Sequence, residues 1–401
     1  MEENQVHIPN GWELESLGKV VSFSTGKKDV NQGNPEGDYP FFTCSKTFTF
    51  SDEYSFDEEA LMVAGNGDVG TVHYYNGKFE AYQRTYVLRN LKIDVQFLFQ
   101  LLKSELIPYL LSGQSGTTIQ FIKIGQLSGF QFLKPKSKPE QTQIANILSK
   151  VDEAIIQTKQ LIAKYTRIKT GLMQDLLTKG IDEHGNIRSE ETHEFKDSPL
   201  GQIPKEWDYK TLGDNNIIEL HNNKRKPISS KDRANMIGDY PYYGATGIID
   251  MLNVFRVDGE FVLFGEDGDH FLKWVYQEQT ILTNGKFNVS NHAHIVKGTS
   301  ICSTKWIHYF FCHRDITFYL TRQGAGRFKL NKASLLSLPI LLPKSKNEQK
   351  AIIDRIEKVN EYSDNLSLRL NKLKSLKTGL MQDLLSGKVR VNHLIKETAN
   401  V

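Results

Sequence analysis

The chain has 401 residues, of which 39% are hydrophobic and 24% are charged, which is the composition of a globular protein with room for two or three domains. Its formal net charge is only +3, so the overall balance of charged residues does not indicate a nucleic-acid-binding protein. Such a function must be argued from particular segments of the chain. No apolar run approaches the length of a membrane span, the first residues lack the apolar segment of a signal peptide, and the three scattered cysteines predict reduced thiols in the cytoplasm.

The first predicted unit is a globular domain over residues 1–134. It opens with Ile-Pro-Asn-Gly-Trp at residues 8–12, and apolar or alternating segments between Gly, Asn and Asp turns then predict strands. One helix is predicted over residues 95–111, followed by a Gly-containing loop and a last strand. Residues 65–70 fit the pattern G-x-G-x-x-G, but a strand pattern follows them, so they predict a hairpin turn rather than a nucleotide-binding loop.

A long spacer helix is predicted next, within residues 135–178. Its apolar residues recur at steps of three and four, which is the narrow stripe of a coiled-coil seam. Pro135 lies just before the helical pattern, and Glu140 lies in its first turn, where the helix dipole favours a negative charge. At 1.5 Å per residue, a helix from Glu140 to Leu177 would be about 57 Å long.

The whole arrangement then recurs. An acidic connector over residues 179–203, predicted to be a solvated loop, leads to a second domain over 204–342, a second helix over 343–386 and a tail over 387–401 that is expected to be loosely held. The second domain opens with Ile-Pro-Lys-Glu-Trp and has a helical pattern over 305–322. The helix starts (Pro-Lys-Ser-Lys-x-Glu-Gln) and the helix ends (Lys-Thr-Gly-Leu-Met-Gln-Asp-Leu-Leu) both recur 208 residues apart, so the two helices have equal length.

Neither helix can bury its apolar stripe alone. Because a whole domain lies between them, we expect the two helices to pack on each other as an antiparallel coiled coil; the alternative is that each packs on its own domain. The predicted fold class is α+β, with two similar domains of mixed, mainly antiparallel sheet and helices related by a pseudo-two-fold repeat. The predicted helix seam consists of Ile144, Leu148, Val151, Ile155, Ile162, Tyr165, Leu172, Leu176, Ile352, Ile356, Val359, Leu366, Leu370, Leu373, Leu380 and Leu384.

No catalytic arrangement is predicted. The chain has no G-x-x-x-x-G-K-[ST] phosphate loop, no amino-methyltransferase signature of the Asn/Asp-Pro-Pro-Tyr/Phe type and no paired zinc-ligand spacing. Asp267, Asp269 and His270 cluster in one loop, but without further spaced ligands they predict a polar turn rather than a metal site. We therefore expect no catalytic residue, metal or cofactor in this chain.

The two domains share scaffold segments but differ in their loops, which suggests two recognition modules with different targets on equivalent supports. Basic side chains in these loops have aromatic neighbours and could contact phosphates, while Gln, Ser and Thr could read base edges. Ordinary solvated-loop polarity is the alternative for any single position. The candidate DNA-binding residues are Lys46, Lys78, Arg84, Gln114, Ser115, Thr117, Thr118, Gln120, Lys224, Arg225, Lys226, Lys273, Trp274, Lys286, Arg322, Gln323, Arg327 and Lys329.

The paired Ile-Pro-x-x-Trp openings, helix starts and helix ends resemble the specificity subunit of type I restriction–modification systems over nearly the whole chain. The resemblance implies two target-recognition domains that each read one half of a split double-stranded DNA site, and a helical spacer that sets the distance between the half-sites. By analogy with dimeric DNA-binding proteins, the half-sites would lie about 34–36 Å apart.

The same resemblance implies partners that carry the catalytic equipment. Two modification subunits would bind S-adenosylmethionine and methylate adenine N6, and restriction subunits would use ATP and Mg²⁺ for translocation and cleavage, while this chain is not an enzyme by itself. Two alternatives remain: a coiled-coil scaffold without DNA recognition, and a fused restriction enzyme with an active site of its own.

Overall fold

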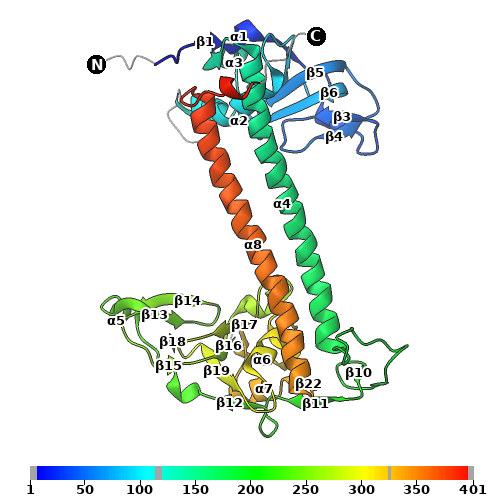
Figure 1. The fold of residues 1–401 in the computed structure, drawn as a ribbon, viewed down its shortest axis with the longest axis vertical. Helices are drawn as coiled ribbons and strands as arrows, with labels where there is room; N and C mark the ends of the chain where they lie inside the picture. Colours follow the sequence, from blue (N-terminus) through cyan, green and yellow to red (C-terminus); the bar gives the residue numbers. More distant parts are fainter. Residues whose placement is uncertain (1–6, 113–119, 324–326, 396–401) are drawn as a thin grey trace. The chain divides into compact units, whose positions relative to one another are not determined.

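The computed structural model describes residues 7–112, 120–323 and 327–395. The chain forms two compact units, each of which combines one globular domain with parts of both long helices. The first unit contains residues 1–161 and 366–401, and the second contains residues 162–365. The long helices, α4 (Lys138–Thr178) and α8 (Lys346–Leu385), are each continuous (Figure 1).

A six-stranded sheet with the order β2-β7-β5-β6-β3-β4 forms the first domain. Its strands are β2 (Ser22–Thr25), β3 (Tyr39–Phe42), β4 (Thr49–Ser51), β5 (Phe56–Ala64), β6 (Val72–Ala81) and β7 (Thr85–Arg89). Neighbouring strands are antiparallel except β3 and β6, which are parallel. Helix α2 (Val95–Ser112) packs on one face of β5 and β6, and a second cluster covers Ala60 and Met62, so the second half of β5 is fully buried.

Shorter elements connect this sheet to the long helices. They are β1 (Trp12–Ser16), α1 (Leu17–Val20), η1 (Val30–Gln32), α3 (Ile124–Ser128), β8 (Gln131–Pro135) and η5 (Asn392–Leu394). Strands β1 and β8 are antiparallel, with Trp12 opposite Pro135, so the start of the domain is held beside the segment that enters α4.

The second domain contains two four-stranded sheets, with the orders β12-β19-β16-β17 and β14-β13-β18-β15. Strands β13 and β18 are parallel, as β3 and β6 are in the first domain, and β11 pairs with β22 as β1 pairs with β8. The strands of the second unit are β9 (Phe195–Lys196), β10 (Ile203–Pro204), β11 (Trp207–Thr211), β12 (Ile218–Leu220), β13 (Ile237–Tyr243), β14 (Ile248–Leu252), β15 (Val257–Asp258), β16 (Phe261–Gly265), β17 (Thr280–Thr283), β18 (Lys286–Val289), β19 (Ala293–Gly298), β20 (Thr321–Gln323), β21 (Arg327–Lys329) and β22 (Pro339–Pro343).

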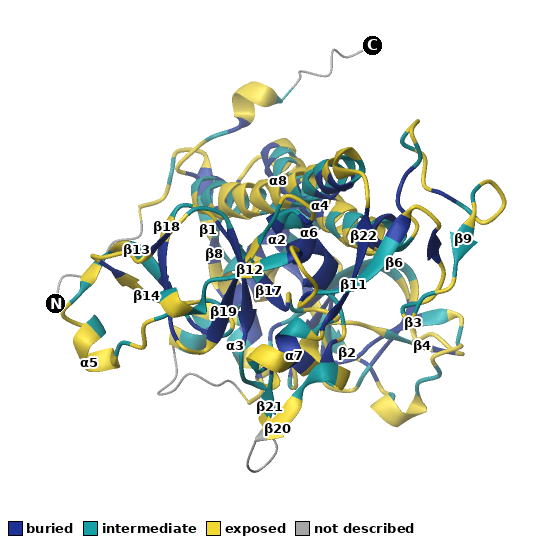
Figure 2. Cartoon of the chain, turned by 90° about the horizontal axis from the view of Figure 1, so that it is seen from below, coloured by how far each residue is buried: buried dark blue, intermediate teal, exposed yellow. Residues whose placement is uncertain are grey.

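Helices complete the second domain: η2 (Asn222–Lys224), α5 (Ser230–Arg233), η3 (Asp269–Lys273), α6 (Thr304–Phe311), η4 (Thr317–Tyr319) and α7 (Lys332–Leu336). Helix α6 packs on β16, β17 and β19 and is buried along most of its length. Figure 2 shows these buried residues in dark blue and the many exposed residues of α4 and α8 in yellow.

Within each unit, the beginning of one long helix packs beside the end of the other. In the first unit, Ile144 and Leu148 of α4 share a hydrophobic cluster with Leu384 of α8. In the second unit, Leu176 joins Ile352 and Ile356 in another cluster, which lies at the opposite ends of the two helices. The pairing is therefore antiparallel. All sixteen predicted seam residues are buried or half-buried, and the clusters that contain the residues at the helix ends also contain domain residues.

The structure corrects several predicted boundaries. The helix predicted over 305–322 ends at Phe311, because Asp315 forms a turn in which its carboxylate accepts hydrogen bonds from the backbone and hydroxyl of Thr317. Each domain has short helices besides the single one expected. The helix-entry prolines end strands β8 and β22, and the helices start three residues later. No helix among the described residues is long and apolar enough to cross a bilayer.

A carboxylate in the first turn of each long helix, with a side chain at most 10% exposed, holds the segment that follows the other helix. Glu348 of α8 pairs with Arg188 of the connector and also accepts hydrogen bonds of 3.1 Å from the indole of Trp207 and the backbone of Ile181. In the first unit, Arg390 contacts the buried carboxylate of Glu140 at 2.6 and 2.8 Å. The connector and the first part of the tail are thus anchored, in contrast to the solvated loop and loosely held tail expected from the sequence.

The glutamine that follows each of these glutamates ties the helix start to its domain. Gln141 donates a hydrogen bond to Pro135 O at 2.8 Å and accepts one from the backbone of Asp94, just before α2, at 3.0 Å. Gln349 makes the same pair of contacts, with Pro343 O at 3.0 Å and with the backbone of Ser303 at 3.2 Å. The repeated Glu-Gln motif is therefore a structural joint between domain and long helix.

Replacing Arg188 by alanine should destabilise the second unit by about 3 kcal/mol, because it leaves the carboxylate of Glu348 buried without its cation. Urea unfolding followed by tryptophan fluorescence measures this, since three of the four tryptophans belong to this unit. The control is Lys205→Ala, which removes an ion pair with Glu194 between highly exposed side chains and should leave the midpoint unchanged. Equal midpoints for both variants would contradict the anchoring role.

Candidate nucleic-acid interface

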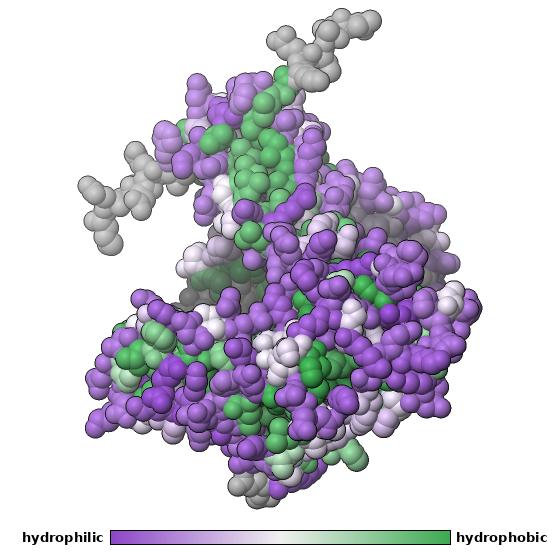
Figure 3. All heavy atoms as spheres, turned by 60° about the horizontal axis from the view of Figure 1, so that its bottom comes forward, coloured by the Kyte–Doolittle hydropathy of each residue, from purple (hydrophilic) through white to green (hydrophobic). Residues whose placement is uncertain are grey.

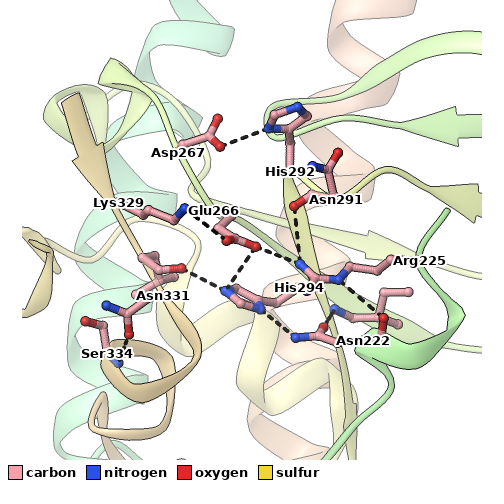
Figure 4. A network of polar contacts seen from close by, with 12 residues as sticks. Asn222, Arg225, Glu266, Asp267, Asn291, His292, His294, Lys329, Asn331 and Ser334 are labelled. Atoms are coloured by element: carbon pink, nitrogen blue, oxygen red, sulfur yellow. Dashed lines mark hydrogen bonds and ion pairs between the residues drawn. The ribbon is translucent and has the colours of Figure 1, made fainter. Parts of the chain in front are cut away.

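A polar network lies where the central strand β16 of the second domain ends (Figure 4). Glu266, the residue after β16, accepts a hydrogen bond from the guanidinium of Arg225 at 2.6 Å, and its other carboxylate oxygen lies 3.6 Å from Lys329 Nζ. Arg225 follows η2 and Lys329 ends β21, so three separate segments meet at one carboxylate. Opposite charges in this half-buried place hold the loops in a defined arrangement.

His294 forms the buried part of this network. Its Nε2–H donates to the backbone oxygen of Leu330 at 2.7 Å, because a carbonyl can only accept, and its Nδ1 accepts from the Asn222 amide at 2.8 Å. Asn222 in turn accepts a hydrogen bond from the backbone of Ile295 at 3.0 Å. Burial lowers the pKa of His294, so the ring is neutral at pH 7 and its tautomer is set by these partners.

The rim of the network is exposed. His292 Nδ1 lies 2.9 Å from the Asp267 carboxylate, and the backbone oxygen of Asn291 accepts from Arg225 at 3.3 Å. Asp267, which we predicted to belong to a polar turn, instead forms an isolated β-bridge with Lys329, while Asp269 begins η3 and His270 is buried. The exposed side chains of Asn291 and His292 therefore stand on an ordered support, as groups that read bases need to do.

The equivalent end of the central strand in the first domain, β5, also gathers three loops. Asp68 accepts a hydrogen bond from the backbone of Lys46 at 3.0 Å, and the backbone oxygen of Arg84 accepts one from Gly65 at 3.0 Å. The segment 65–70 is the turn between antiparallel β5 and β6, which confirms the predicted hairpin. The side chains of Lys46 and Arg84 are exposed, and no carboxylate of the described residues lies within 4.0 Å of either cation.

The structure brings only some of the predicted first-domain residues together. Lys46 and Arg84 lie at the end of β5, and Gln120 lies next to Phe121, which bridges to the same turn at Asn66. Lys78 lies at the other end of β5, opposite Asp57, with its ammonium 4.7 Å from the ring centre of Tyr54. The predicted residues that fall outside the described part of the chain are Gln114, Ser115, Thr117 and Thr118.

In the second domain, Arg225 and Lys329 belong to the network, and Lys224 and Lys226 flank Arg225. The hairpin β20–β21 carries Arg322 and Arg327 as exposed side chains, with Gln323 paired opposite Arg327 along the backbone.

The other predicted residues of this domain lie elsewhere. Lys286 occupies the position equivalent to Lys78, opposite Asp258 and 4.6 Å from the ring centre of Phe255. Lys273 ends η3, and the next residue, Trp274, lines a groove with α4 and α6 whose lining contains none of the other predicted DNA-binding residues.

Sequence reasoning missed Asn222, Glu266 and His294 as parts of this site. His292 and His294 are two residues apart at the start of a strand and are followed by apolar residues. Because alternate residues of a strand share a face, this pattern could have indicated a polar site at the start of that strand. The sequence analysis considered histidines only as zinc ligands and excluded that role because paired zinc-ligand spacings are missing, and nothing in the sequence placed these side chains beside Arg225.

Acidification from pH 7.5 to pH 5 should weaken the second unit. Burial, together with Lys169, lowers the pKa of His308 from 6.5 to about 4, and burial lowers the pKa of His270 and His294 as well. Between pH 6.5 and 4 the unfolded chain binds protons that the folded chain does not, so the stabilisation present above pH 6.5 is lost as the pH falls. For His308 alone the loss at pH 5 is about 2 kcal/mol.

Urea midpoints at the two pH values measure this effect. The variant His308→Gln should show a weaker pH dependence than the natural chain, whereas His184→Gln, at a side chain that is 76% exposed, should not. A pH dependence that is the same in all three chains would contradict the assignment of a neutral, buried His308.

Comparison with known proteins agrees with this architecture. The model of the family described as type I restriction modification DNA specificity domain matches residues 9–166 and again residues 204–375. The type I restriction enzyme EcoDI specificity subunit of Escherichia coli is 25% identical over 399 residues, which cover 94% of this chain and 88% of that protein. The type I restriction enzyme MjaVIII specificity subunit of Methanocaldococcus jannaschii is 23% identical and covers 98% of this chain and 96% of its own length.

A solved structure shares the fold. The crystal structure of a type I restriction–modification system S subunit from Mycoplasma genitalium superposes with a TM-score of 0.65 over 96% of this chain and 98% of that chain, at 18% identity. The family match covers well over half of the chain, in two copies that coincide with the two domains and their long helices. The chain therefore belongs to the type I restriction modification DNA specificity domain family.

Proposed function

We propose that this chain is the DNA sequence-recognition subunit of a type I restriction–modification complex. The observation that carries the proposal is the doubled family match on two domains, each of which ends its central strand in a cluster of basic and hydrogen-bonding side chains. Each domain would read one half of a bipartite duplex site. A scaffold without DNA recognition and a fused enzyme with its own active site are not favoured by this match.

The two clusters differ in a way that suits two different half-sites. In the first domain, Lys46 and Arg84 project from ordered loops, so they are available for phosphates or guanine edges. In the second domain, Arg225 and Lys329 are already engaged by Glu266, so the exposed Arg322 and Arg327 are the better candidates for phosphate contacts. The helical spacer would raise the effective concentration of one half-site once the other is bound.

The long helices would dock the modification subunits. Exposed apolar side chains on them include Ile168 and Leu376, which are 41% and 51% exposed and occupy equivalent positions of the repeat. Figure 3 shows that hydrophobic side chains gather in several separate areas among hydrophilic ones on the face it presents. In this proposal, the modification subunits carry S-adenosylmethionine and restriction subunits carry ATP and Mg²⁺. The complex acts on DNA in the cytoplasm, where the three buried thiols would stay reduced.

A mobility shift with a random-sequence duplex, with and without a co-expressed modification subunit, tests the proposal. We expect the logarithm of the DNA-binding constant to fall linearly with the logarithm of the salt concentration, because neutralised phosphates release counterions. Mapping methylated adenines in DNA from the co-expressing cells should reveal a bipartite motif. Binding that is independent of salt, or a continuous motif without a gap, would contradict the proposed role.

A further inference from the structure

A groove of about 700 Å³ lies in the second unit and takes no part in the polar network described above. One wall is the last part of α4, including Met173 and Leu177, and the other is the end of α6, including Tyr309 and Phe310. The segment after η3 closes one side with Trp274, Val275 and Tyr276, of which Val275 and Tyr276 are 67% and 76% exposed. The lining is thus mainly apolar and reaches the surface.

Two cations face this groove without a carboxylate partner. Arg314 lies with its guanidinium 3.8 Å from the ring centre of Phe310 and donates through Nε to Phe310 O at 3.1 Å. Lys169 lines the opposite wall, on α4. No carboxylate of the described residues lies within 4.0 Å of either cation. Asp315 also lines the groove, and its carboxylate accepts hydrogen bonds from the backbone and hydroxyl of Thr317. Burial lowers the pKa of Arg314 to about 10, which reflects how poorly its charge is solvated.

The first unit shows how the position equivalent to Lys169 is neutralised internally. Lys377, which is equivalent to Lys169 in the repeat, contacts Asp152 at 2.6 Å, and Gln100 and Lys103 approach the other oxygen of that carboxylate at 3.0 and 3.8 Å. Burial opposes ionisation of Asp152, yet the hydrogen bonds from Lys377 and Gln100 keep its pKa below the ordinary value. The first unit therefore supplies its own counter-ion.

In the second unit the position of Asp152 is taken by Asn360. Asn360 lies close to Tyr309, and its Oδ1 is buried without a hydrogen-bond partner among the described residues. The second unit therefore has the lysine, Lys169 on α4, but no acidic residue at the equivalent position of α8. A desolvated cation without a counter-ion, as Arg314 is, is costly, and an external carboxylate would relieve that cost.

We propose that this groove docks an extended segment of a partner protein in which carboxylates flank a large apolar side chain. The apolar side chain would lie between Met173, Leu177 and Phe310, and the carboxylates would pair with Lys169 and Arg314. A protein segment suits the groove better than nucleic acid does, because phosphates favour open, hydrated basic surfaces, whereas this lining is mainly apolar by area and its charged residues are Lys169, Arg314 and Asp315. The proposal goes beyond DNA recognition and makes the two units unequal as docking places.

The test uses the full chain and peptides selected for it. A random 12-residue peptide library is panned on the immobilised natural chain, with counter-selection on the Asn360→Asp variant, which recreates the acid of the first unit. The selected peptides are labelled with fluorescein and titrated by anisotropy against the natural chain, Asn360→Asp, Lys169→Met and the first-unit control Asp152→Asn. Tryptophan fluorescence verifies that each variant is folded. If Asn360→Asp does not fold, the proposal is tested by the affinity of Lys169→Met alone.

We expect the selected peptides to combine at least two carboxylates with an aromatic or aliphatic residue, and to bind Asn360→Asp and Lys169→Met about tenfold or more weakly than the natural chain and Asp152→Asn. Neutral or basic selected peptides would overturn the proposal, as would equal affinities for all four chains. Displacement of the peptide by a 30-base-pair duplex, together with a tenfold loss of duplex binding in Lys169→Met, would assign the groove to DNA and would also overturn it.

Discussion

Removing seven residues from each long helix should shorten the gap between the two recognised half-sites by about three base pairs, while both half-site sequences stay the same. Seven residues turn the helix by about 700°, which is within about 20° of two full turns, so the seam stays on the same face. The loss in length is about 10.5 Å at 1.5 Å per residue, and a base pair rises about 3.4 Å. Residues 157–163 and their repeat equivalents 365–371 are suitable, because they lie away from the anchored helix ends.

Methylation mapping in cells that contain the variant and its modification subunit measures the gap. A chain in which only 365–371 is removed is the matched control. In this control only α8 is shorter by seven residues, so α8 and α4 can no longer keep their contacts in both units, such as that of Lys377 with Asp152. We therefore expect methylation to be abolished. An unchanged gap in the doubly shortened chain would show that the helices do not set the spacing.

The long helices could be predicted from the sequence because their signals are local and repeated. The spacing of apolar residues and the 208-residue offset indicate length and pairing without any tertiary information. The predicted end of the helix over 305–322 was wrong because it depends on a competition between two local structures that periodicity does not show. Its apolar residues continue past Phe311, but Asp315 offers the backbone a competing turn, and periodicity cannot show which of the two is more stable.

The candidate site could be predicted only in outline. Basic loop residues were identifiable, but a charge pattern does not reveal which of them are already neutralised by the protein itself. Arg225 forms an ion pair with Glu266, and the ammonium of Lys78 contacts the ring of Tyr54. Lys46 has neither kind of partner among the described residues. Each of these contacts joins residues far apart in the chain. Glu140 was likewise assigned to the helix dipole alone, although an arginine from a distant segment pairs with it and with its repeat equivalent Glu348.

Replacing both Lys46 and Arg84 by alanine should weaken duplex binding by ten- to a hundredfold near physiological salt and reduce the slope of log K against log salt by about 1.8. The reason is that each lost phosphate contact removes about 0.9 from this slope. Both side chains are exposed and their loops are held through backbone hydrogen bonds, so the change should not disturb the domain.

The position of Lys78 makes it the matched control for this double variant. It is an exposed lysine of the same domain, but it lies at the opposite end of β5, opposite Asp57 and beside Tyr54. If the DNA lies against the loops at the end of β5, Lys78→Ala should leave the slope almost unchanged. Methylation mapping then distinguishes phosphate contacts from base reading, because a base contact by Arg84 would relax one position in one half-site only. A slope that falls for Lys78→Ala but not for the double variant would place the DNA at the other end of this sheet.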